Sequence, residues 1–371
     1  MIKHIQYISR AVLLAALLFF CNAVVSAGIN QFEKRCLWVV RNTLTSPQSI
    51  DEMLTFADIN GFNHLLVQVR GRGDAYYDSK LVPRSELLLD PDFDPLEYII
   101  EKAHNRGIEV HAWVNAYFIW AAEKRPRALH HVYNSRPNWL DSNGFATVNK
   151  QQNNNGKKYF LAPHHPDVNN HLLTVFRELT ALYEIDGLHL DYIRFRDAEY
   201  GNNEDAKTHF YKSKYKNQEK IFEDDESVVW DDFRRAAVTN LVKETKAMLL
   251  EVRPDCKLSA AVKPNLRLAH NRFYQEWDVW LAAGYLDWVM PMNYTPDIHD
   301  FAENIDLIYD QLPKKYRDRI IMGIALYNQD ELSASDKIKY SKITRFKGIS
   351  LFSYNVFLEN QNYMNQLIIN P

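Results

Sequence analysis

The sequence is poor in cysteine, with 3 among 371 residues. Cys21 lies in the export signal predicted below, so only Cys36 and Cys256 belong to the predicted mature chain. Two cysteines far apart in the sequence cannot build a disulfide-rich scaffold or a cysteine-based metal centre. We expect two buried free thiols, and a single disulfide between them is the alternative.

Neither sign of charge dominates this chain. It has 44 basic and 47 acidic residues and a formal net charge of -3 at pH 7. Proteins that bind nucleic acids through the phosphate backbone concentrate positive charge, and this composition shows no such excess. We therefore predict no nucleic-acid partner.

The chain has no early apolar run long enough to span a membrane. The run at residues 11–20 follows Lys3 and Arg10 and precedes Val25-Ser26-Ala27, which is typical of a secretory signal. We predict that residues 1–27 are a cleaved signal peptide and that residues 28–371 form the mature domain. The mature protein would be exported to the periplasm or the extracellular space, without a stable membrane span. A retained N-terminal anchor is the alternative.

Several motifs of catalytic and cofactor-binding sites are missing. The sequence contains no GxSxG nucleophile elbow, no phosphate-binding P-loop and no HExxH zinc motif. The neighbouring histidines in the pairs His130-His131 and His164-His165 would point apart on an extended segment. We therefore predict neither a cofactor nor a metal ion.

Short apolar runs alternate with helical patterns along the mature chain. Because strand–helix alternation is typical of a parallel sheet, eight such runs predict a single (β/α)8 barrel, an α/β fold. We expect its long loops after strands 2, 3 and 4. The predicted strands are residues 36–40, 65–69, 108–114, 188–192, 258–262, 288–292, 320–325 and 349–352.

Polar residues stand at the ends of these predicted strands. In a (β/α)8 barrel the carboxyl ends of the strands surround one opening, where ligands bind. Each such residue has a simpler alternative, which is a loop residue hydrogen-bonded to the backbone. The predicted site residues at the opening are Arg70, Asn115, Asp191, Arg194, Lys263, Asn293, Tyr294 and Tyr354.

Aromatic residues make up 13% of the chain, including 21 tyrosines and 8 tryptophans. Flat aromatic faces favour ligands with rings, such as sugars. Trp120 is the predicted stacking residue, together with Trp139 and Tyr76. Trp113 could also stack, but it alternates into the barrel and belongs to the core in the alternative interpretation.

Several stretches of the chain resemble the bacterial glycosyl-hydrolase-like family 10. They are residues 70–77, 83–85, 94–96, 104–107, 111–115 and 186–195, in the same order as in that family. The resemblance implies an exported (β/α)8 barrel that acts on glycans at the cell envelope. Some members are thought to cleave the glycan strands of peptidoglycan.

The segment from Asp186 to Ile193 also resembles the DGxDxDxE motif of chitinase-like barrels. This chain departs from the motif at two positions, because His189 replaces an aspartate and Ile193 replaces the acidic glutamate. The substrate-assisted mechanism of that family is therefore not expected here.

Together these features predict an exported glycoside hydrolase that cleaves O-glycosidic bonds in a cell-envelope polysaccharide or another polysaccharide. Such hydrolysis needs a carboxylic acid and a second carboxylate. We predict Asp191 as the first, with Arg70 and Arg194 holding its charge or clamping the substrate. Hydroxyl groups of the sugar would be bound by Asn115, Asn293 and Tyr294.

The second carboxylate has two candidates. Asp74 lies in the family-like stretch beside Gly73, whose missing side chain allows a ligand to approach the backbone. Asp297 follows the sixth strand, where it could equally cap the next helix. We favour Asp74 as second carboxylate or substrate binder, although it could simply order its loop by pairing with Arg70 or Arg72. The alternative for the whole chain is a glycan-binding protein on a degenerate barrel.

Overall fold

The computed structural model describes residues 29–143, 158–215 and 226–369. The predicted signal peptide at residues 1–27 lies outside these ranges. A sheet of eight parallel strands forms the centre of the molecule. The strands are β1 (Lys34–Val39), β2 (His64–Arg70), β3 (Glu109–Asn115), β6 (Gly187–Asp191), β7 (Lys257–Val262), β8 (Trp288–Pro291), β9 (Ile321–Ala325) and β10 (Gly348–Phe352).

The sheet curls into a barrel. Its order is β8-β7-β6-β3-β2-β1-β10-β9, so the first strand β1 pairs with β10 near the end of the chain. Two isolated parallel bridges, Val289–Ile320 and Met292–Gly323, connect the edge strands β8 and β9. The predicted (β/α)8 barrel is confirmed, and every predicted strand lies within two residues of an observed one.

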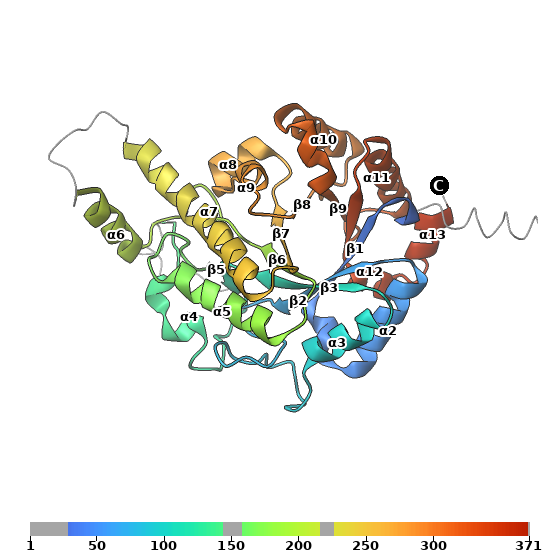
Figure 1. Cartoon of the computed structure of the whole chain (residues 1–371), viewed down its shortest axis with the longest axis horizontal. Helices are drawn as coiled ribbons and strands as arrows, with labels where there is room; N and C mark the ends of the chain where they lie inside the picture. The colour runs from blue at the N-terminus through green and yellow to red at the C-terminus, as the bar shows by residue number, and fades with distance from the viewer. Residues whose placement is uncertain (1–28, 144–157, 216–225, 370–371) are drawn as a thin grey trace, which may run out of the picture.

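Helices surround the strands, as Figure 1 shows. Ser46 and Asp94 cap two of them, each directly before a proline at the first helical position. Apolar residues on the inner faces of the helices pack on the outer surface of the sheet. The helices are α2 (Pro47–Ile59), α3 (Pro95–His104), α5 (Val168–Leu182), α7 (Glu226–Val252), α8 (Leu266–Phe273), α9 (Trp277–Ala282), α10 (Ile298–Gln311), α11 (Glu331–Ile343), α12 (Tyr354–Glu359) and α13 (Tyr363–Ile369).

The loops after β2, β3 and β6 are long, as predicted. They contain elements that the sequence did not predict, namely the antiparallel pair β4 (Phe118–Trp120) and β5 (Tyr159–Phe160), and the helices α4 (Val132–Ser135) and α6 (Glu204–Tyr215). Two or three residues are too few for a strand period to emerge, and α6 is largely polar. Four 3-10 segments complete the described elements: η1 (Ile29–Gln31), η2 (Arg41–Thr45), η3 (Pro137–Trp139) and η4 (Lys314–Arg319).

Side chains fill the inside of the barrel. Trp38 packs edge-on against Trp113 and His189, with ring centroids 4.7 and 4.9 Å apart. Trp113 is therefore a core residue, as the alternative interpretation held. Cys36 and Cys256 are both buried free thiols, so that expectation is confirmed. Within the described part of the chain, no helix has the length and apolar character needed to cross a membrane.

Candidate active site at the carboxyl ends of the strands

The barrel brings Asp191 and Asn115 side by side. They are the last residues of the neighbouring strands β6 and β3, and their Cα atoms are register partners. The chain after β3 stays attached to β6, because the Ala116 N–H donates to the Asp191 carbonyl at 2.8 Å. Both side chains are therefore positioned by rigid strands at the end of the barrel where ligands bind in this fold.

Asp191 is a buried carboxyl with an unusual pKa. The residue is only 7% exposed, and its Oδ1 accepts the Tyr192 N–H at 2.7 Å. Burial raises its pKa from 3.8 to about 6, and the Tyr192 N–H and the positive charge of Arg194 oppose this rise. A carboxyl with this pKa can hold a proton in mildly acidic solution and release it near neutrality.

The backbone turns sharply directly after this carboxyl. Tyr192 has a φ of 50°, in the left-handed region that residues other than glycine rarely adopt. Such strain is found at functional sites, where the surrounding structure holds it in place. This residue also donates its N–H to the Asp191 carboxylate.

Two cations lie around Asp191. Arg194 donates through Nη1 to the carbonyls of Phe195 and Arg196 at 3.0 and 3.3 Å, while its buried Nε has no partner among the described residues. Burial lowers the pKa of Lys263 to about 8, with the charge of Arg194 as the second cause, whereas Asp191 opposes the shift. Both cations lie over the Phe273 ring, 5.0 and 4.7 Å from its centroid.

Tyr294 completes this group. Burial raises the pKa of its hydroxyl well above 10, and the negative charge of Asp191 is the second cause. Its ring packs on Phe352, with centroids 5.4 Å apart. Of the predicted site residues, the structure thus brings together Asp191, Asn115, Arg194, Lys263 and Tyr294, and we call this set the Asp191 cluster.

The raised pKa of Asp191 predicts how stability depends on pH. Because the folded state binds this proton more tightly than the unfolded state, stability falls as the pH rises from about 4 to 6. Asp191→Asn removes the buried charge and should stabilise the fold at pH 7.5 by on the order of 2 to 3 kcal/mol, but hardly at pH 4. Thermal melting of both proteins at the two pH values measures this. An equal stability difference between the two proteins at pH 4 and pH 7.5 would contradict the raised pKa of Asp191.

Asp74 lies in a second region, which we call the side pocket. This pocket has a volume of about 160 Å³. Asp74 Oδ1 accepts the Arg72 N–H at 3.0 Å, and the neighbouring Gly73 has a φ of 76° that favours glycine. The pocket is lined by Arg41, Arg72, Asp74, Tyr76, Pro83, Arg84, Ser85, Glu86, Leu87, Trp120, Pro126, Ala128 and His131.

Trp120 forms part of the same pocket. Its indole N–H donates to the Lys124 carbonyl at 2.9 Å, and the Arg72 guanidinium lies 5.9 Å from its ring centroid. The structure therefore brings the predicted stacking residue next to Asp74. Loops after β2 and β3 supply these two residues, so no periodic pattern in the sequence could have joined them.

Arg41 was missed by the sequence interpretation. It lies two residues after the end of β1, lines the side pocket and donates through Nη1 to Gln68 Oε1 at 2.9 Å. Its charge also acts on the pKa of Tyr192 in the Asp191 cluster. Arg41 is thus within electrostatic reach of both regions. The same strand-end rule, applied to the first predicted strand, would have found it.

Four further predicted residues lie elsewhere or have their polar groups occupied. Arg70 is fully buried and donates to the carbonyls of Asn115 and Ala116, because a register shift after Gln68 turns it out of the barrel. Tyr354 is buried against Phe56 of α2. These two side chains support the fold and do not face the opening.

Asn293 and Asp297 follow β8. The Asn293 amide donates to the Phe301 carbonyl and accepts from Asn304, both at 2.9 Å. Asp297 is the N-cap of α10, since its Oδ1 accepts the N–H groups of His299 and Asp300. The capping alternative for Asp297 is therefore confirmed.

Asp141 is another carboxyl that the sequence did not single out. Its Oδ1 accepts the N–H groups of Ser142 and Gly201 at 2.9 and 3.0 Å. Burial raises its pKa to about 7, and Oδ2 has no partner in the described ranges. No local pattern marks this residue, because its environment is formed by a distant loop.

The family model and the curated relatives that match this chain are all described as glycosyl hydrolases or glycosyl hydrolase-like. The chain matches the family model described as glycosyl hydrolase-like 10 over residues 33–341. It is 23% identical over 299 residues to the glycosyl hydrolase DigH of Escherichia coli (strain K12), covering 74% of this chain and 64% of the relative. It is 26% identical to the glycosyl hydrolase YngK of Bacillus subtilis (strain 168), covering 72% and 53%. The chain thus spans less than two thirds of these relatives.

A solved structure supports the same fold. The glycoside hydrolase domain of PgaB (BpsB) from Bordetella bronchiseptica superposes with a TM-score of 0.64, covering 90% of this chain and 98% of that domain. The two sequences are 11% identical, so this likeness concerns the fold alone. The family match over most of the chain, and not this structural likeness, carries the assignment. The chain belongs to the glycosyl hydrolase-like 10 family.

Proposed function

We propose that this protein is a glycoside hydrolase with Asp191 as its proton donor. The observation that carries the proposal is the buried Asp191 carboxyl at the end of β6, whose pKa is raised to about 6. Glycosidases need such a carboxylic acid to protonate the leaving oxygen of the glycosidic bond. Membership of a glycosyl hydrolase-like family supports this reaction type.

The Asp191 cluster suits the charge changes of this reaction. When Asp191 gives its proton to the leaving oxygen, its carboxylate becomes negative in a poorly hydrated place. Arg194 and Lys263 then stabilise that charge, since both act electrostatically on Asp191. Because Asp191 must start protonated, turnover should fall as the pH rises above about 6.

Asp74 is the proposed second carboxylate or substrate-binding group. It lines the side pocket with Trp120, a ring on which a sugar could stack, and with Arg41, which also acts on Tyr192 beside Asp191. A glycan that occupied both regions would run from the side pocket to the Asp191 cluster. To act as the second carboxylate, Asp74 would have to face Asp191 across one sugar linkage.

The proposed substrate is a polysaccharide of the cell envelope, and glycan strands of peptidoglycan are the first to test. Two curated relatives carry the name glycosyl hydrolase, which supports a glycan substrate. The test incubates the purified protein with glycan strands and with other polysaccharides, and follows new reducing ends and product masses. Shortened products from one polysaccharide class are expected.

A non-catalytic glycan-binding protein is the second candidate. This function is supported by the lack of a second carboxyl in the β6 motif. Ile193, which is fully buried, stands where chitinase-like barrels have their acidic glutamate. In that case the incubation gives saturable binding without any shortened product. The same experiment therefore separates the two functions.

We also propose that the chain is exported and processed after Ala27. The predicted signal at residues 1–27 supports this, with its basic start and apolar run. The intact mass of the protein from the periplasm or the medium should correspond to a chain beginning at Gly28. A mass that still includes Met1 would contradict processing.

A further inference from the structure

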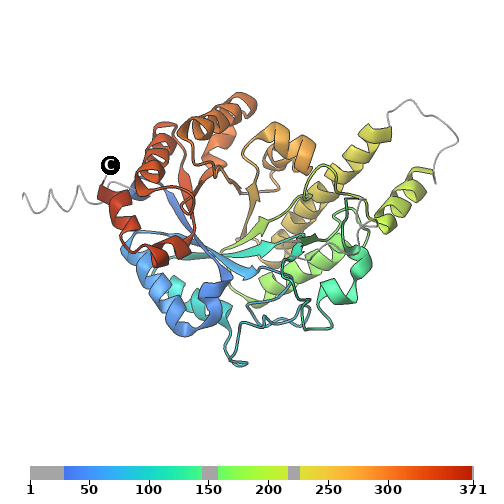
Figure 2. The same cartoon turned by 180° about the vertical axis from the view of Figure 1, so that it is seen from behind.

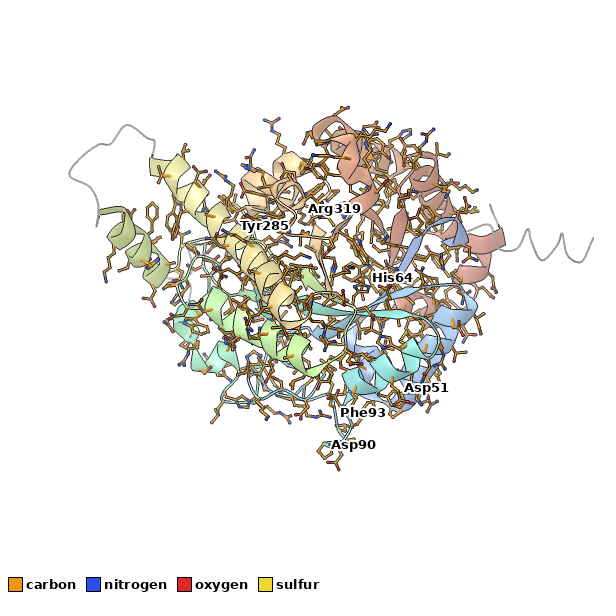
Figure 3. The ribbon with its side chains drawn as sticks, in the orientation of Figure 1. Asp51, His64, Asp90, Phe93, Tyr285 and Arg319 are labelled. Atoms are coloured by element: carbon orange, nitrogen blue, oxygen red, sulfur yellow. The ribbon has the colours of Figure 1, made fainter. Side chains whose placement is uncertain are left out.

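Three possible metal ligands converge at the other end of the barrel. His64 is the first residue of β2, Glu109 is the first of β3, and His111 follows two residues later. His64 and Glu109 are register partners, so their side chains leave neighbouring strands at the same level. Figure 3 labels His64, which lies among the strands inside the ring of helices. Among the described residues, this is the one group of three such side chains whose ligand atoms come together.

The distances between the ligand atoms match a metal site. His64 Nδ1 lies 3.1 Å from Glu109 Oε2 and 3.1 Å from His111 Nε2, and His111 Nε2 lies 3.4 Å from Glu109 Oε2. Ligand atoms about 2.0–2.1 Å from a tetrahedral zinc ion are about 3.3 Å from one another. The three atoms thus form one face of a tetrahedron of nearly the right size.

Protons alone cannot make all three contacts favourable when Glu109 is ionised. If both rings donate to Glu109, their two N–H groups face each other at 3.1 Å. If one ring donates to the other, the accepting nitrogen turns its lone pair toward the carboxylate. In both arrangements one contact is repulsive. A cation bound by the three lone pairs removes this conflict.

The surroundings hold both rings in this arrangement. A Cβ at Gly187 would lie 2.0 Å from His111 Nδ1, so only glycine leaves room for the ring. Trp288 packs against His64 and His111, with ring centroids 5.4 and 5.2 Å away. His111 Nδ1 is buried and has no hydrogen-bond partner in the described structure, so no such bond fixes the ring. The position of His111 Nε2 is instead set by the packing of the ring against Gly187 and Trp288.

We propose that His64, Glu109 and His111 bind one divalent transition-metal ion, with zinc as the expected class. Two imidazoles and one carboxylate are suitable zinc ligands, and water can take the fourth position. Both histidine side chains are buried, whereas the Glu109 side chain is 47% exposed, so an ion would enter from the Glu109 side. This differs from the expectation of no metal, which rested on the missing HExxH motif and on the adjacent histidine pairs. Glu109 and His111 share a face of β3 because they are two residues apart, and the pairing of β2 with β3 brings His64 to them.

The proposed ion ties two strands together and takes no part in hydrolysis. Six residue steps along β2 separate His64 from Arg70, a distance of about 20 Å along an extended strand. The ion is therefore remote from the Asp191 cluster. It should stabilise the barrel by binding the folded state, because the unfolded chain does not hold the three ligands together.

The test uses the full mature chain without a histidine tag, after treatment with a chelator. Zinc titrated by calorimetry should bind at one ion per chain and raise the melting temperature. His64→Gln and Glu109→Gln should each weaken this binding at least about a hundredfold. His104→Gln is the matched control, since His104 and Asp186 form an exposed pair with only two ligands, 2.8 Å apart. It should leave zinc affinity unchanged.

Cobalt provides a second measurement. Bound at this site, it should show the visible absorption of a tetrahedral ion, and Glu109→Gln should abolish that absorption. Glu109 is half-exposed, so this variant should fold even if His64→Gln does not. Wild-type zinc affinity in Glu109→Gln would overturn the proposal. The absence of zinc binding by the wild-type protein would overturn it equally, and would show that the three side chains form only a hydrogen-bonded cluster.

Discussion

Asp191→Asn is expected to lower glycan turnover at least about a thousandfold without loss of stability at neutral pH. The amide can still accept the Tyr192 N–H, which Asp191 Oδ1 accepts at 2.7 Å, so the local backbone should keep its shape. It cannot supply the proton that the leaving oxygen needs. Turnover at saturating substrate and melting temperature, measured on the same preparation, test both parts.

Asp255→Asn is the matched control for this variant. Asp255 is exposed and precedes β7, at the opposite end of the barrel from the Asp191 cluster. The Asp255→Asn variant should hydrolyse the glycan at the wild-type rate. If Asp191→Asn folds and hydrolyses the glycan normally, Asp191 has no role in the reaction. If it fails to fold, the carboxyl is needed for structure.

The second large effect concerns Asp74 and Asp297. Asp74→Ala should lower turnover by about a hundredfold or more, because it removes the proposed second carboxylate or substrate-binding group from the side pocket. Asp297→Ala should hydrolyse normally and lose about 1 kcal/mol of stability, since it removes the cap of α10. Turnover on one glycan and unfolding in urea distinguish the two variants.

Each outcome of this pair has a clear meaning. Full activity in Asp74→Ala together with an inactive, folded Asp297→Ala would reverse the two assignments. Full activity in both would leave Asp191 without either proposed partner, and Asp141 would become the next carboxyl to test, because its pKa is raised to about 7. Asp74→Asn separates charge from shape, since its amide oxygen can still accept the Arg72 N–H.

The sequence predicted the barrel well because each strand is a local feature. Runs such as residues 258–262 are apolar and short, and they match β7 closely. The position of Asp191 followed from the same pattern, since it ends a strand in a parallel fold. Its neighbours Asn115, Arg194 and Lys263 were predicted by the same rule, and the structure places all three near it.

The rule fails where local geometry changes at a strand end. Arg70 ends β2, but a register shift turns its side chain to the outside of the barrel. Tyr354 begins α12 and packs outward on Phe56. A single residue offset decides which face a side chain takes, and the sequence does not show that offset.

Contacts between distant segments could not be predicted either. The side pocket joins Asp74 to Trp120 and His131 from another loop, and Asp141 depends on Gly201 for one of its hydrogen bonds. The group of His64, Glu109 and His111 depends on the pairing of β2 with β3. These contacts cannot be predicted from one sequence, because it does not show how the strands pair or where the loops lie.

The most direct measurement is a crystal structure of Asp191→Asn with an oligosaccharide that the wild-type protein cleaves. The variant should hold the sugar intact. The proposed mechanism predicts the linkage oxygen within about 3 Å of the side chain at position 191, with a second carboxylate on the other side of the linkage. A sugar whose linkages all lie away from position 191 would contradict the assignment of Asp191 as the proton donor.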